Sequence, residues 1–200
     1  MALRNVLKDE DPALRKKSRE VKEVTDRIKT TMMDMVETMR FYRGVGLAAP
    51  QVGTLRRMFV AEPSQGEVYY MINPEILEEE GAVSDTEGCL SIPNYYGTVE
   101  RPEKIRIKAL DMNGEEKEYT FEGFAARVMC HETDHLDGIL YSDKAVEMHT
   151  VEQEIERLNQ KVKEEDKERI KEEKEQAKQA KKAEKAAKEA AKAAEAEEAE

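Results

Sequence analysis

The spacing of apolar residues predicts a long helix over residues 25–42. Its apolar side chains recur every three or four positions, which places them on one face of a helix. Thr25 is a typical N-cap residue, and Gly44 follows as a stop signal. We expect the methionines of this face to fill gaps in a core. The apolar positions are Ile28, Met32, Met35, Val36 and Met39.

Shorter apolar runs predict strands in the middle of the chain. Residues 58–61, 69–72 and 76–83 are rich in β-branched, aromatic and other apolar residues, as strands are. Asn113-Gly114 separates two further runs, at 105–111 and 117–121. Because Asn-Gly is a strong signal for a tight turn, these two runs are expected to form a hairpin.

The C-terminal part of the chain changes character. Val151, Ile155, Leu158 and Val162 keep helical spacing, so a C-terminal helix is expected. After Ile170 the sequence contains no Leu, Val, Ile or aromatic residue. Lys, Glu and Ala favour a helix, but such a helix has no face to bury. We therefore expect a catalytic domain over 1–165 and a charged tail over 166–200 that is helical or disordered.

The composition excludes several classes of protein. The chain has 200 residues and a formal net charge of −11, which argues against general nucleic-acid binding. No apolar run approaches the roughly 20 residues that span a membrane. Two cysteines without an apolar signal segment indicate a reducing compartment, so we expect a cytoplasmic protein.

A metal site is predicted by His131-Glu132-Thr133-Asp134-His135. On a helix, residues four apart share a face, so both histidines can bind one cation. Glu132 lies about 100° around the helix, where it can take a proton from water. This helix begins near Gly123, and Phe124 and Val128 continue the histidine stripe. The expected fold is α+β, with mixed or antiparallel strands packed around this central metal-binding helix, followed by the C-terminal helix and tail.

The third metal ligand is expected to be a cysteine. Cys130 precedes His131 and points about 100° away from the histidine face of the helix, which is typical of a buried, unreactive thiol. Cys89 lies between Gly88 and Pro93, in what we interpret as a bent segment that could deliver a thiolate to the helix. Spacing alone leaves Cys89 open to both readings, a ligand or another buried thiol.

A glycine-rich segment at 44–53 has two interpretations. Its glycines would allow the backbone to approach a ligand closely, although a tight turn explains them as well. Gln51 carries an amide that could donate a hydrogen bond to a developing oxyanion, or could cap the turn.

Together, Gly-Val-Gly-Leu-Ala-Ala-Pro-Gln at 44–51, Glu-Gly-Cys-Leu-Ser at 87–91 and His-Glu-Thr-Asp-His at 131–135 resemble the three signature motifs of the peptide deformylases. The resemblance covers roughly residues 1–160. It implies a hydrolase that removes the N-formyl group from formyl-methionine at the start of new polypeptides and releases formate. It also implies one divalent metal, Fe(II) in the cell, with Zn(II), Ni(II) or Co(II) also possible.

The resemblance further implies a role for each motif residue. Cys89, His131 and His135 would bind the metal, and Glu132 would be the general base. Gln51 and the Leu90 backbone N–H would stabilise the oxyanion. Val45 and Gly46 would pair with the peptide, and Phe124 and Val128 would line the methionine pocket unless both are core residues.

Two other functions, and a contact with the ribosome, are also compatible with parts of the sequence. A metalloendopeptidase would use the same His-Glu-x-x-His motif with a downstream third ligand. His149 could serve as that ligand only if the chain reversed soon after Gly138. A non-enzymatic adaptor would use the tail as its working part. Characterised deformylases can contact the ribosome exit region through a basic C-terminal helix, but this tail is nearly charge-balanced.

Overall fold

The computed structural model describes residues 2–197, with side-chain detail that leaves out residues 172, 175, 177 and 179–197. The chain divides into two compact units, Met1–Val151 and Glu152–Glu200. The second unit continues the helix α3 (Val151–Glu197), which includes most of the predicted tail. The tail side chains from residue 179 onward lie outside the described residues.

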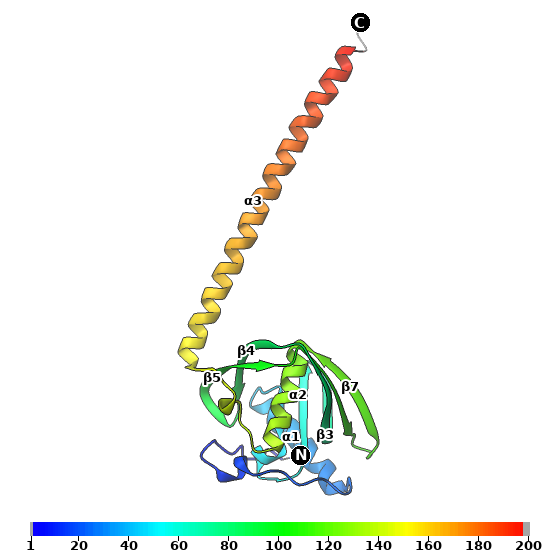
Figure 1. The fold of residues 1–200 in the computed structure, drawn as a ribbon, viewed down its shortest axis with the longest axis vertical. Coiled ribbons are helices and arrows are strands. Elements are labelled where there is room, and N and C mark those ends of the chain that lie inside the picture. The colour runs from blue at the N-terminus through cyan, green and yellow to red at the C-terminus, as the bar shows by residue number, and fades with distance from the viewer. Residues whose placement is uncertain (1, 198–200) are drawn as a thin grey trace. The chain divides into compact units, whose positions relative to one another are not determined.

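The first unit combines two long helices with two antiparallel sheets (Figure 1). This agrees with the mixed α+β class, the antiparallel strands and the C-terminal helix expected from the sequence. The helices are α1 (Asp26–Phe41) and α2 (Gly123–Leu136), and the 3-10 turns are η1 (Pro12–Arg15), η2 (Ala49–Val52) and η3 (Tyr141–Asp143). The strands are β1 (Gly46–Ala48), β2 (Met58–Ser64), β3 (Glu67–Glu80), β4 (Val83–Cys89), β5 (Ile92–Arg101), β6 (Lys104–Leu110), β7 (Glu116–Glu122) and β8 (Glu147–Thr150).

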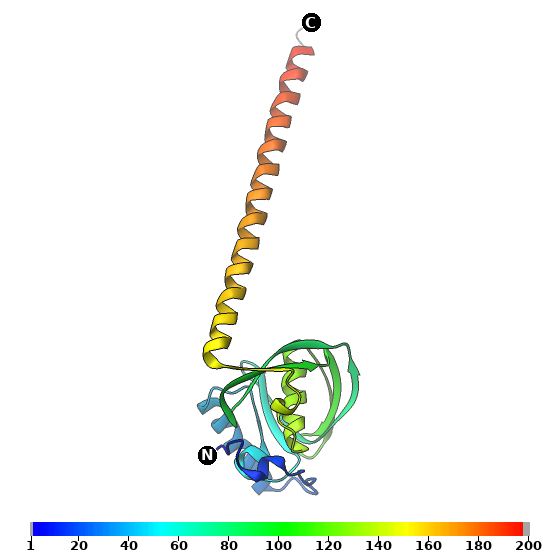
Figure 2. The ribbon, with the colours of Figure 1, turned by 60° about the vertical axis from the view of Figure 1, so that its left-hand side comes forward.

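The larger sheet has the strand order β1-β2-β3-β6-β7, and the smaller has the order β4-β5-β8. Helix α2 runs between the sheets in both views (Figure 1, Figure 2) and contacts strands of each. Strand β1 is an edge of the larger sheet, because β2 is the only strand among residues 2–197 that pairs with it. The unpaired side of β1 is therefore available to another extended chain.

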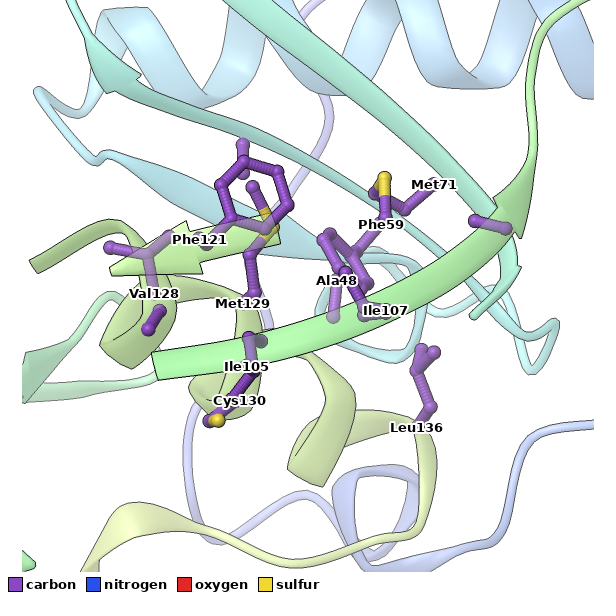
Figure 3. Packing of buried hydrophobic residues seen from close by; sticks show 13 residues of the cluster. Ala48, Phe59, Met71, Ile105, Ile107, Phe121, Val128, Met129, Cys130 and Leu136 are labelled. Carbon is purple, nitrogen blue, oxygen red and sulfur yellow. The ribbon is translucent and has the colours of Figure 1, made fainter. Parts of the chain in front are cut away.

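Both faces of the larger sheet are buried at β2. Along β2, Phe59 and Ala61 point into the cluster that packs on α2, whereas Met58 and Val60 point into the cluster that packs on α1. This alternation follows from the period of two in a strand, and it explains why the run at 58–61 is apolar without interruption. Figure 3 shows the α2 side of the sheet, where Ile105 and Ile107 of β6 lie close to Met129.

The predicted start of the first helix and the predicted hairpin are both confirmed, because capping and turn residues mark them in the sequence. Helix α1 begins after Thr25, whose hydroxyl accepts a hydrogen bond from the Ile28 N–H. The predicted hairpin is β6–β7, and Gly114 adopts a left-handed φ of 81° in its turn. Asp111 completes this turn by accepting hydrogen bonds from the N–H groups of Asn113 and Glu115.

Two strand predictions need correction. The runs at 69–72 and 76–83 belong to one strand, β3, because Asn73 takes a left-handed φ of 50° and forms a bulge without ending the pairing. Strand β3 ends at Glu80, since Gly81 reverses the chain with a φ of 68°. The sequence analysis also missed β4, β5 and β8. The side chains of β4 are mostly exposed, so this strand has no alternating apolar pattern.

Candidate active site

Three predicted ligands converge in the first unit. Cys89 lies at the end of β4, and His131 and His135 lie one turn apart on α2. Their donor atoms all lie within 4.8 Å of one another, and Cys89 Sγ is 3.3 Å from His135 Nε2. Cys130 is 5% exposed and belongs to the apolar cluster under α2. The structure therefore groups Cys89, and not Cys130, with the histidines.

The setting of Cys89 differs from the bent loop expected from the sequence. Strand β4 runs through Cys89, and the chain reverses at Leu90 and Ser91 into β5. The ladder hydrogen bonds of a hairpin hold the thiol more firmly than an open loop would. His149 lies in β8 opposite Tyr96 of β5, outside the group of donors.

One thiolate and two imidazoles are donors that suit a divalent transition metal. Bonds of about 2.0–2.3 Å to such an ion would place donors up to ~4 Å apart, close to the spacing of these atoms. Burial would raise the pKa of the Cys89 thiol, but His135 and His131 hold that pKa well below its usual range. The site thus favours the thiolate form that a metal requires.

A buried carboxylate supports one of the histidines. Glu87 Oε2 lies 2.8 Å from His131 Nδ1, and both carboxylate oxygens accept hydrogen bonds from Arg101, at 2.8 and 3.0 Å. Burial alone would raise the pKa of Glu87, but the hydrogen bonds from Arg101 and His131 lower it to about 2. A carboxylate that binds the far nitrogen of a ligating imidazole fixes the ring orientation and tautomer.

This charged network extends beyond Glu87. Arg127 donates to Glu87 at 2.8 Å, and Arg101 donates to Asp134 at 2.6 Å. None of these residues was predicted from the sequence to take part in the site. Glu87 precedes Cys89 by two positions, and residues two apart on a strand point to the same face. This spacing could have indicated that Glu87 lies beside the metal ligands. Nothing in the sequence marks Arg101 as its partner.

Glu132 is positioned beside the glycine-rich segment. Its side chain is buried, and Oε2 has no hydrogen-bond partner within the part of the chain that the structure describes. Burial raises the pKa of Glu132 to about 7. A methyl group at Gly46 would lie 2.7 Å from Glu132 Cδ, so Gly46 leaves the space that this carboxylate occupies.

Gln51 is 1% exposed, and both ends of its amide are engaged. The carbonyl oxygen accepts a hydrogen bond from Ala48 N–H at 2.8 Å, and Nε2 donates to Ser91 Oγ at 3.1 Å. Nε2 also lies 3.4 Å from Cys89 Sγ. Gln51 therefore caps its turn with one end of the amide and directs N–H groups toward the metal ligands with the other.

A cleft of about 490 Å³ opens above these groups. Glu132, Gln51 and Cys89 line its floor together with His131. The expected peptide-binding and pocket residues line it too, as does Leu90. These expected residues are Val45, Gly46, Phe124 and Val128. Phe124 is 56% exposed, whereas Val128 is 5% exposed and also packs in the core.

Comparison with known proteins identifies the family. The model of the family described as polypeptide deformylase matches residues 3–151. The chain belongs to the peptide deformylase family. It is 52% identical over 147 residues to peptide deformylase 1 of Clostridium acetobutylicum, which covers 74% of this chain and 97% of that protein. It is 48% identical over 146 residues to the peptide deformylase of Alkaliphilus metalliredigens, covering 73% and 99%.

Solved structures agree with this assignment. The crystal structure of peptide deformylase from Thermotoga maritima matches with a TM-score of 0.71 and 40% identity, covering 74% of this chain and all of that one. A peptide deformylase from Acinetobacter baumannii, bound to Met-Ala-Ser, matches with a TM-score of 0.68 and 34% identity, covering 72% and 98%.

The function predicted from the three motifs is confirmed by family membership. The protein is a hydrolase that removes the N-formyl group from the start of newly synthesised polypeptides. The relatives named here are deformylases, so they give no support to the metalloendopeptidase alternative. Membership of a family of enzymes also argues against a non-enzymatic adaptor. No helix in residues 2–197 combines the length and apolar character needed to cross a membrane.

Proposed function

We propose that Cys89, His131 and His135 bind one divalent metal and that Glu132 moves the proton during hydrolysis of the formamide bond. The observation that carries this assignment is the convergence of the three donor atoms within 4.8 Å, directly beside the buried Glu132. When bound, the metal would supply Lewis-acid polarisation of water and of the formyl carbonyl.

Fe(II) is the proposed ion in the cell, with Zn(II), Ni(II) or Co(II) as substitutes. A thiolate with two imidazoles suits all four ions, so the donor set supports a transition metal without selecting one. Metal analysis of protein purified without oxygen tests the choice of iron. A stoichiometric content of another metal in such a preparation would contradict it.

In the proposed mechanism, Glu132 accepts a proton from the attacking water and returns it to the leaving amine. Its unpartnered Oε2 is available for this proton. A base works best when its pKa lies near the working pH, and burial brings the pKa of Glu132 to about 7. Gly46 supports the role sterically, because it leaves room for the carboxylate at the base of the cleft.

Gln51 and the Leu90 backbone N–H are the proposed donors to the oxyanion that develops on the formyl oxygen. The Gln51 amide cannot easily turn over, because Ala48 N–H binds its carbonyl oxygen. This arrangement keeps Nε2 directed toward Cys89 before substrate arrives. A donor that is oriented in advance typically contributes about 2.7–4 kcal/mol to stabilisation of the transition state.

The substrate peptide is proposed to extend β1 as an added strand. Gly46 belongs to β1, an edge strand, and Val45 precedes it at the rim of the cleft. Backbone pairing of this kind binds a peptide irrespective of its side chains. Phe124 and Val128 are the proposed wall of the methionine pocket. The tripeptide Met-Ala-Ser in the Acinetobacter relative supports a site that accepts an N-terminal methionine.

We also propose a catalytic domain over 1–165, a cytoplasmic location and contact of the tail 166–200 with the ribosome exit region. The matched family residues, 3–151, support the first of these. The activity supports the cytoplasmic location and the ribosome contact, because its substrates are newly synthesised polypeptides. Turnover by a 1–165 fragment, and cosedimentation of the full chain with ribosomes, test the division and the contact.

One experiment tests the assignment of the base. Wild type and Glu132→Gln are compared for metal content and for release of formate from a formyl-Met peptide. The variant should keep its metal, because Glu132 is not among the ligands, while kcat falls about 10²–10⁴-fold. Loss of the metal would instead make Glu132 a ligand, and unchanged kcat would remove it from the mechanism.

A further inference from the structure

A second cavity, of about 1090 Å³, lies apart from the active-site cleft. It is formed by the segment before α1, the first turns of α1 and the loop at 54–56. None of its lining residues also lines the cleft. Two carboxylates, from Glu20 and Glu23, line it. They are outnumbered by five cationic side chains, which are those of Arg4, Arg19, Lys22, Arg27 and Arg56.

Most of these cations lack a countercharge. Arg4 pairs with Asp34 at 2.9 Å. In the described part of the chain, the side chains of Arg19, Lys22, Arg27 and Arg56 form no ion pair. This is unexpected in a protein with a net charge of −11, where acidic partners are abundant. A cavity whose lining carries an excess of one sign of charge concentrates ions of the opposite sign. The five cations outnumber the two carboxylates, so this cavity attracts anions.

The backbone beneath the cations is fixed in place. Arg19 N–H donates to Leu55 O at 3.2 Å, and Arg57 N–H donates to Arg19 O at 2.8 Å. These bonds form a short parallel bridge that holds Arg19 and Arg56 side by side. The Asn73 side chain bonds both backbone groups of Val21, at 2.9 and 2.8 Å. A site built on such anchored segments loses little entropy when a ligand binds.

An unsatisfied donor and several hydroxyl groups add to the cationic lining. Arg4 Nε is buried and has no hydrogen-bond partner among the described residues. Such a group costs free energy unless a ligand or water satisfies it. Thr25, Thr30 and Thr54 also line the cavity. Thr25 caps α1, a helix of 16 residues, so the positive end of the helix dipole adds to the potential.

We propose that this cavity binds the phosphate group of a phosphorylated small molecule about the size of a nucleotide. Four of the five cations are arginines, whose planar guanidinium groups donate paired hydrogen bonds to phosphate oxygens. The volume exceeds the need of a lone phosphate and lies near the upper end of small-molecule pockets, roughly 300–1,000 Å³. The ligand would bind without entering the cleft.

Isothermal titration of the metal-loaded full chain with inorganic phosphate and with ADP tests the proposal. Both should bind, and ADP should bind more tightly because it fills more of the cavity. Arg19→Gln combined with Arg56→Gln should weaken both affinities at least tenfold. The matched control, Lys16→Gln with Lys161→Gln, removes the same charge outside the cavity and should leave the affinities unchanged.

Three outcomes would overturn the proposal. These are absence of binding by wild type at millimolar ligand, equal weakening by the control pair, and displacement of ADP by a formyl-Met peptide, which would place the ligand in the cleft. Turnover of that peptide should be the same in the Arg19/Arg56 variant as in wild type. If this variant fails to fold, Arg27→Gln, at an exposed position of helix α1, replaces it, and tight binding by Arg27→Gln would equally contradict the proposal.

Discussion

His131 Nδ1 lies 2.8 Å from Glu87 Oε2, and both side chains are buried. When Nδ1 donates its proton to the carboxylate, Nε2 is the nitrogen whose lone pair is free for a metal. Arg101 holds the same carboxylate through two hydrogen bonds. The ion pair between Glu87 of β4 and Arg101 of β5 thus sets the orientation of the proposed ligand His131, although neither residue is itself a proposed ligand.

Glu87→Gln should weaken metal binding about 10–100-fold, because an amide fixes the imidazole less firmly than a carboxylate does. The free energy of unfolding should fall by about 3–5 kcal/mol, since buried Arg127 loses its countercharge and buried Arg101 keeps only Asp134. Metal competition titrations and urea unfolding measure the two effects. Glu100→Gln, on an exposed position of β5, is the control and should change neither. Unchanged metal affinity in Glu87→Gln would refute the orienting role.

Cys89→Ala should lose the metal and the activity, because two imidazoles alone hold a divalent ion weakly. Cys130→Ala should keep both. The buried Cys130 side chain contributes packing only, so its loss should cost about 1–3 kcal/mol of unfolding free energy. Metal content per folded molecule separates the two variants. Stoichiometric metal in Cys89→Ala would show that the thiol is not a ligand.

Gly46→Ala should reduce kcat about 10²-fold while the metal is retained. The added methyl group would displace the Glu132 carboxylate, and small misplacements of a catalytic group are costly. The effect should nearly vanish in the Glu132→Gln background, where the base is already absent. A double-mutant cycle on kcat measures this coupling. Additive losses would mean that Gly46 acts independently of Glu132, for instance through the peptide alone.

Gln51→Glu should reduce turnover per metal-loaded molecule about 10²–10³-fold, the usual effect of removing one oxyanion donor. The new carboxylate can still accept the hydrogen bond from Ala48 N–H, so capping of the turn persists. Steady-state kinetics and thermal unfolding, measured on the same samples, distinguish the two roles. Near-normal kcat would leave Gln51 as a cap only.

Asp34 should make stability depend on pH in the acid range. A hydrogen bond from the Ala2 N–H, together with Arg4, lowers the pKa of Asp34 below its usual 3.8. Because the folded pKa is the lower one, this stabilisation is complete above the unfolded pKa and disappears as the pH falls through the folded value. Asp34→Asn should lose about 1–3 kcal/mol at pH 7 and show a smaller decline in melting temperature toward pH 2.5. Asp9→Asn, an exposed position, should decline as wild type does.

The parts of the site that sequence could predict are those fixed by local geometry. His131 and His135 share a face because they are four positions apart on one helix, and that spacing is visible in the sequence. The choice of Cys89 over Cys130 depends on how β4 docks against α2, a contact between segments some 40 residues apart. Spacing left that choice open, and the resemblance to a family resolved it.

The parts that escaped prediction depend on pairing between strands. Glu87 meets Arg101 only because β4 and β5 form a hairpin. The exposed side chains of β4 gave no apolar pattern from which that hairpin could be expected. The bulge at Asn73 in β3 was missed for a related reason. Asn73 followed by Pro74 is typical of the end of a strand when only the local sequence is considered. In the structure, pairing with β2 and β6 continues β3 through the left-handed Asn73.

The order of the elements along the chain determines when this enzyme becomes active during its own synthesis. Cys89 belongs to a sheet that is completed only by β8, which ends at Thr150, and the two histidines are also translated late. A growing chain therefore has no assembled centre until nearly all of the first unit has left the ribosome. Throughout that interval, a new copy cannot remove its own formyl group. Its amino terminus depends on a deformylase molecule that was completed earlier.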